Sequence, residues 1–103
     1  MRTLDNAPET VENEIDKMLD ECKDLVSKRG KIHGPIDETC RTIASLWSVR
    51  TGVNVRPSDV CDMLEDLKWV RSKAQPDGRY HHDNSVDGIN YKTFAYALRE
   101  RGS

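Results

Sequence analysis

Two basic side chains lie on a helical face that is otherwise apolar. In residues 58–74, Leu64 and Leu67 recur at helical spacing, Arg71 follows near the middle of the same stripe, and Lys68 lies on its flank. Both cations could snorkel past the edge of the core near the end of the helix. A buried cation needs a partner, however, and an arginine fork beside a lysine suits a phosphate. We therefore treat Lys68 and Arg71 as candidate ligand-binding residues.

Complementary polar groups occur in the last helical stretch, residues 84–101. Asp83, Asp87 and Asn90 lie on or beside the side that carries its apolar residues, and Tyr91 follows Asp87 by one turn. The two carboxylates could simply favour the positive end of the helix, with Asp83 or Asn84 as the N-cap. Capping does not explain Asn90, so this side is also a candidate ligand surface.

The simplest arrangement pairs the two cations with the two carboxylates across the last two helices. One outcome is an internal network of ion pairs among Lys68, Arg71, Asp83 and Asp87. The other is a polar pocket in which the cations meet a phosphate while Asp83, Asp87 and Asn90 take donors from a ribose or base. Tyr91 or Trp47 could stack on the base.

Three further residues are weaker candidates for ligand contact. Arg50 follows Trp47 along the apolar stripe of residues 35–51, although a cation in a last helical turn is favourable anyway. His33 precedes that helix, and His82 lies in a polar loop beside Asp83. Both histidines could be solvated, or could contact a phosphate or ribose.

The periodicity of apolar residues predicts the elements that position these groups. Stripes at helical spacing predict helices over residues 9–29, 35–51, 58–74 and 84–101, after a flexible segment 1–8. Gly30 and Gly34 are expected to break the first helix, Gly52 to end the second, and Ser58 and Asn84 to cap the last two. No alternating strand pattern is present. The sequence predicts an all-α small four-helix bundle, one domain over 1–103.

Size, charge and cysteine usage limit the class of protein. A chain of 103 residues leaves much surface exposed, so a homo-oligomer is expected. The net charge of −2 argues against general nucleic-acid binding by charge alone, and we expect no sequence-specific nucleic-acid partner. No long apolar run or leader is present, so we expect a cytoplasmic protein with no membrane partner. The three cysteines form no CxxC pair, which favours buried reduced thiols over structural zinc.

Residues 28–96 resemble a phage and prophage domain of unknown function that is distantly similar to MazG-like all-α nucleotide pyrophosphatases. The most specific part is Lys-x-x-Arg at 68–71 followed by Asp-x-x-x-Asp-Gly-x-x-Tyr at 83–91. The other matching pieces are Arg29 with His33-Gly34, Ile43-Ala44-Ser45-Leu46-Trp47 and Pro57-Ser58-Asp59-Val60. His33 stands where the family more often has Tyr, and Thr39 where Asn is usual. The first helix is not covered.

The resemblance implies a nucleotide as the ligand and a bacterial host infected by phage as the setting. One hypothesis is a non-catalytic protein that sequesters a nucleotide signal of bacterial immunity, in an anti-defence role against Thoeris or CBASS. A protein that only sequesters the nucleotide needs no cofactor, metal or catalytic residue.

The second hypothesis is a Mg-dependent pyrophosphohydrolase. Asp83 and Asp87 would then be the metal ligands. The Glu-Glu-x-x-Glu signature of that class is absent; Asp20, Glu21 and Asp24 imitate it most nearly, but they fall mainly off the apolar stripe and favour a solvated surface. A third hypothesis is a structural or partner-binding bundle. The absent signature favours sequestration over catalysis.

Overall fold

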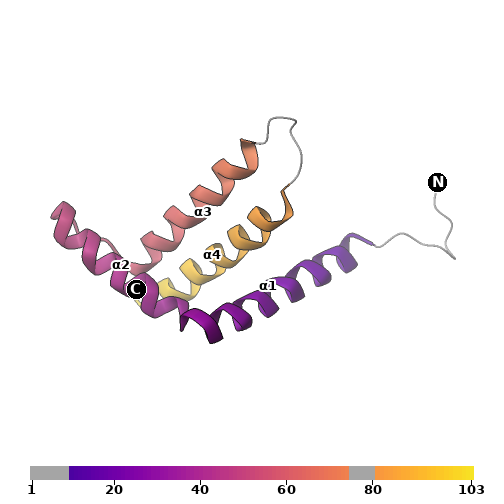
Figure 1. The fold of residues 1–103 in the computed structure, drawn as a ribbon, viewed down its shortest axis with the longest axis horizontal. Coiled ribbons are helices and arrows are strands. Elements are labelled where there is room, and N and C mark those ends of the chain that lie inside the picture. The colour runs from indigo at the N-terminus through magenta and orange to yellow at the C-terminus, as the bar shows by residue number, and fades with distance from the viewer. Residues whose placement is uncertain (1–9, 75–80) are drawn as a thin grey trace, which may run out of the picture.

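The computed structural model describes residues 10–74 and 81–103, which form four helices and no strand (Figure 1). These are α1 (Val11–His33), α2 (Ile36–Thr51), α3 (Pro57–Lys73) and α4 (His82–Glu100). The all-α prediction is confirmed. The segment 1–8, predicted to be flexible, lies outside the described residues.

The predicted end of the first helix is wrong. Instead of ending at Arg29, α1 continues through Gly30 to His33, and Gly34 at φ +80° ends it. Gly30 keeps helical geometry because glycine costs a helix only about 1 kcal/mol relative to alanine. Thr10 caps the other end, where its side chain accepts a hydrogen bond from the Asn13 N–H. The four extra residues carry His33 along the same helix as Arg29.

The predicted caps of the last two helices are also wrong. Arg56 is the N-cap of α3, and Ser58 is buried, with its hydroxyl donating to the Ser103 carbonyl at 3.0 Å. His81 caps α4, and its ring nitrogen Nδ1 accepts from the Asn84 N–H at 3.3 Å. Asn84 is therefore a buried residue inside the helix.

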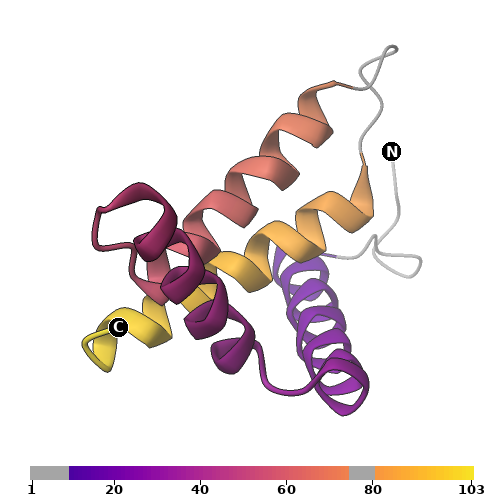
Figure 2. The same ribbon diagram turned by 60° about the vertical axis from the view of Figure 1, so that its left-hand side comes forward.

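The helices form a small, open bundle. α3 and α4 share the largest interface, α2 lies across one end of this pair, and α1 packs mainly on α4 (Figures 1 and 2). The radius of gyration is 17.0 Å, and the extents are 59 × 31 × 25 Å. A compact domain of this length has a radius of about 13 Å. The extension arises because α1 projects away from the other helices.

A small core joins α2, α3 and α4. Its most buried members include Cys40 of α2 and Cys61 of α3, whose sulfur atoms lie 3.2 Å apart and share a hydrogen bond. Cys22 is buried separately on α1, so all three cysteines are free and buried, as predicted. The remaining core residues are Ala44, Val60, Ala95 and Leu98.

The predicted apolar stripe of α3 is only partly buried. Val60 belongs to the core and Leu64 packs against it, but Met63, Leu67 and Val70 are exposed. α2 covers the side of α3 that carries Cys61, so the side that carries Met63, Leu67 and Val70 faces outward.

Among the described residues, no helix is long and apolar enough to cross a membrane.

Candidate functional site

Asp87 of α4 is a buried carboxylate that holds two cations from two other helices. Its side chain is 9% exposed. Oδ1 accepts a hydrogen bond from Nη1 of Arg29 on α1 at 2.9 Å, and Oδ2 lies 3.0 Å from Nζ of Lys68 on α3. The carboxylate therefore connects α1, α3 and α4. Because two cations face one carboxylate, the three side chains carry a formal charge of +1.

Two polar contacts fix the register of α1 on α4 beside this cluster. The Asn90 amide Nδ2 donates to the Cys22 carbonyl at 3.2 Å, and the Cys22 thiol donates weakly to the Val86 carbonyl at 3.8 Å. Asn90 and Cys22 are both buried. Burial raises the pKa of the Cys22 thiol, and the nearby Glu21 carboxylate raises it further. Asn90 therefore has a structural partner in addition to its place beside the candidate site.

A pocket of about 450 Å³ opens next to Arg29. The end of α1, the start of α2 and the middle of α4 enclose it. Its walls combine the Arg29 guanidinium with aromatic and amide side chains; the lining residues that could contact a ligand are Arg29, His33, Thr39, Asn90, Tyr91 and Phe94. Such a mixture of apolar walls and a few polar groups is typical of small-molecule sites.

Tyr91 and Phe94 form the aromatic wall of the pocket. Their rings meet edge to face, with centroids 6.3 Å apart and planes at 75°. Burial raises the pKa of the Tyr91 phenol, and the Asp87 carboxylate raises it further. The phenol therefore stays protonated at neutral pH and can donate a hydrogen bond to a ligand.

The predicted network of four charges forms only in part. Lys68 and Asp87 pair as expected, but Arg71 and Asp83 are exposed and do not join them. Arg71 lies in the last turn of α3, two turns beyond Leu64, and its side chain is exposed there. The second cation comes instead from Arg29.

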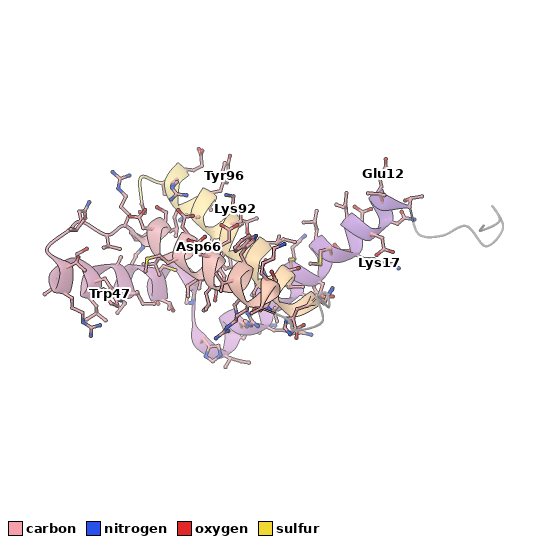
Figure 3. All side chains as sticks on the ribbon, turned by 90° about the horizontal axis from the view of Figure 1, so that it is seen from above. Glu12, Lys17, Trp47, Asp66, Lys92 and Tyr96 are labelled. Atoms are coloured by element: carbon pink, nitrogen blue, oxygen red, sulfur yellow. The ribbon has the colours of Figure 1, made fainter. Side chains whose placement is uncertain are left out.

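Three other candidate residues lie away from the pocket. Trp47 and Arg50 stack on each other near the end of α2, with the guanidinium 5.5 Å from the ring centroid. Thr39 and Arg50 are eleven positions apart, which is about 16 Å along a helix; Figure 3 shows Trp47 at the outer end of α2. His82 begins α4 and lies 2.6 Å from the Glu21 carboxylate.

A second, open cleft of about 730 Å³ runs between α1 and α4 on the other side of Arg29. Carboxylates from both helices line it: Asp20, Glu21 and Asp24 from α1, and Asp83 and Asp87 from α4. Lys17 and Lys28 also contribute. Within residues 10–74 and 81–103, no group of three or more His, Cys, Asp or Glu side chains converges closely enough to hold a metal ion.

Arg29 is the site residue that the periodicity argument missed. It lies seven residues after Cys22 and four before His33, so it continues the side of α1 that carries the buried Cys22. Ending the helix at Arg29 made this cation look terminal and solvated. A charged residue in register with a buried cysteine was the signal that could have identified it.

The fold and the site together define an all-α chain with a pocket at the junction of three helices, bordered by the Arg29 guanidinium. It belongs to the DUF6378 family, a domain of unknown function, which matches residues 17–99. The match includes most of α1, so the expectation that the first helix lies outside the family region is wrong. Neither the curated proteins nor the solved structures contain a match.

Proposed function

We propose that this protein binds a small phosphate-bearing nucleotide in the pocket between α1, α2 and α4, and sequesters it without turnover. The observation that carries this proposal is the position of Arg29 at the edge of that pocket. Only Nη1 of its guanidinium contacts Asp87, and the side chain is 51% exposed. The remaining N–H donors are available to a phosphate.

Arg29 is the cation of the pocket that an anionic ligand would meet. Arg29, Lys68 and Asp87 together carry a formal charge of +1, but Lys68 pairs with Asp87 from α3 and does not line the pocket, where Asp37 is a second carboxylate. The first turn of α2 also borders the pocket, and a helix N-terminus attracts anions. Its N-cap residue, Pro35, makes no side-chain hydrogen bond to the first turn.

The apolar side of the pocket suits a nucleobase. Tyr91 and Phe94 present ring surface to the cavity, and stacking of a base on an aromatic ring contributes about 1–3 kcal/mol. Asn90 borders the same space but already donates to the Cys22 carbonyl. His33 lines the same pocket from the end of α1 and would contact a ribose or phosphate.

The resemblance to phage and prophage sequences suggests the setting of this function. We propose that the ligand is a nucleotide signal of bacterial immunity, of the Thoeris or CBASS type, in the cytoplasm of an infected host. The protein would lower the free concentration of the signal by mass action. We also propose that it acts as a homo-oligomer.

A second candidate function is a Mg-dependent nucleotide pyrophosphohydrolase. The acidic cleft between α1 and α4 favours it, because Asp20, Glu21 and Asp24 face Asp83 and Asp87 there. Hard oxygen ligands on two facing helices are what a magnesium–polyphosphate complex needs. Lys68 and Arg29 would then stabilise the developing negative charge.

Mass spectrometry of released ligands distinguishes the two functions. The full chain is mixed with cyclic dinucleotides, ADP-ribose derivatives and nucleoside triphosphates, with and without magnesium, then freed of excess ligand and heat-denatured. Recovery of one intact nucleotide at stoichiometric amount supports sequestration. Recovery of a shortened nucleotide together with pyrophosphate supports hydrolysis. Both functions would be rejected if no nucleotide stayed bound and the removed fraction held neither a shortened nucleotide nor pyrophosphate.

A pair of arginine variants tests the location of the site. Arg29→Gln should weaken binding of the recovered nucleotide at least tenfold, whereas Arg29→Lys, which keeps the charge but loses the fork, should weaken it less. Arg50→Gln is the matched control, because Arg50 lies at the other end of α2. A loss of binding in Arg50→Gln with normal binding in Arg29→Gln would place the site elsewhere.

A further inference from the structure

The N-terminal half of α1 has an apolar stripe that nothing among the described residues covers. α1 has 23 residues, about 34 Å of helix, but Cys22 is its only buried residue. Val11, Ile15 and Leu19 are exposed, Val11 at 77%. Figure 1 shows the first turns of α1 running past the start of α4. The exposed stripe is therefore continuous with the interface that Cys22 forms on α4.

A second uncovered apolar face lies on α3. Met63, Leu67 and Val70 follow one another at spacings of four and three, so they share one side of the helix. All three are exposed, Val70 at 56%. Two separate apolar faces on a chain of this size mark interaction surfaces.

The charges beside these faces are opposite in sign. Residues 11–20 of α1 hold four acidic side chains and one basic, a balance of −3, and Figure 3 shows Glu12 and Lys17 projecting from the free end of the helix. Near the C-terminal end of the α3 face, the exposed charges are Arg71 and Lys73, a balance of +2 over residues 69–74; Lys68 instead pairs with Asp87, and the exposed Asp66 lies beside Met63. Contact between two copies of the same face would place like charges together, whereas contact between α1 and α3 would place unlike charges together.

We propose that two copies of this chain form a dimer in which the N-terminal half of α1 of each copy packs on the exposed face of α3 of the other. Ile15 and Leu19 would lie against Leu67 and Val70, and the acidic flank of α1 would face Arg71 and Lys73. The contact is reciprocal, so a two-fold axis closes the assembly and covers both faces at once. This inference rests on the proposed homo-oligomer and is independent of the proposed ligand.

Sedimentation velocity of the full chain without nucleotide tests the dimer. The wild type, with a chain mass of 11.8 kDa, should sediment as a dimer at micromolar concentration. Ile15→Glu and Val70→Glu should each raise the dimer dissociation constant at least a hundredfold. The matched control is Val49→Glu, at a position of α2 that is 86% exposed and on neither face; it should remain dimeric. All three sites are exposed, so circular dichroism should report the same helix content.

Mixing the variants tests which faces meet. The Ile15→Glu chain keeps a normal α3 and the Val70→Glu chain keeps a normal α1, so an equal mixture should form heterodimers through one intact contact. A monomeric wild type would overturn both the oligomer and this interface. A dimer unaffected by either variant would overturn the interface alone. Disruption by only one of the two variants would show that α1 meets α1 or α3 meets α3, and would also overturn the proposal.

Discussion

Lys68 of α3 and Asp87 of α4 form an ion pair with 3.0 Å between Nζ and Oδ2, inside the largest helix–helix interface of the molecule. The Lys68 side chain is only 16% exposed. The same carboxylate also holds Arg29, so one residue of α4 orients the cation that borders the pocket and the cation that fixes α3. Four consequences of the structure can be measured without knowing the ligand.

Asp87→Asn should destabilise the fold. The substitution keeps the size of the side chain but leaves Lys68 without a counter-charge in a nearly buried position, at a cost of about 2–4 kcal/mol in the free energy of unfolding. Urea denaturation followed by circular dichroism measures it. The control is Asp83→Asn, because Asp83 is exposed in the first turn of the same helix. Its cost should stay below about 1 kcal/mol, and equal effects at the two positions would contradict the central role of Asp87.

The three thiols should react slowly in the native protein and together after unfolding. Cys40 and Cys61 are fully buried and share a hydrogen bond, which with burial raises the pKa of Cys61. Because the thiolate is the reactive form, the raised pKa opposes reaction at Cys61; the hydrogen bond from Cys61 lowers the pKa of Cys40, so its slow reaction depends on burial. Titration with an aromatic disulfide reagent at pH 8, with and without urea, measures the difference. An added cysteine at exposed Ser45 should react at once, and equally rapid native reaction at Cys40 would contradict the described core.

Ionisation of Tyr91 should lower stability in alkali. Burial and Asp87 raise its folded-state pKa above the ordinary 10.0. The phenol of the unfolded chain therefore ionises first as the pH rises past 10, which favours unfolding. Urea denaturation at pH 9 and pH 11 should show a smaller loss of stability in Tyr91→Phe than in the wild type. Tyr96→Phe is the control, because Tyr96 is exposed and should leave the pH dependence unchanged.

Asn90→Ala should loosen α1 more than the rest of the fold. It removes the additional hydrogen bond from the Asn90 amide to the Cys22 carbonyl, whose helical partner remains, and a hydrogen bond of this kind contributes about 0.5–1.5 kcal/mol. Because α1 packs mainly on α4, hydrogen exchange should accelerate in peptides from α1 and change little in α3. Lys92→Ala, on the exposed side of α4, should alter neither. Uniform acceleration in all four helices would instead mean that α1 unfolds with the core.

The helices themselves were determined by local sequence. Apolar spacing and the residues that break helices act within one or two turns, so four helices were predicted with boundaries mostly within two residues of the observed ones. The pairing of Lys68 with Asp87 was predicted for the same reason, since both lie on the inner side of their helices. The continuation of α1 through Gly30 was not predicted, because one glycine lowers helix stability without forbidding the helix.

Which face of each helix is covered was decided only by tertiary structure. Arg71 shares a stripe with Leu64 and Leu67, yet only Leu64 packs against the core; Arg71 lies two turns further along α3, near the end of the helix, and is exposed. Arg29 and Asp87 lie 58 positions apart, so their contact depends on how α1 crosses α4. Periodicity along one helix shows that a face is apolar; only the packing of the other helices determines whether that face is buried.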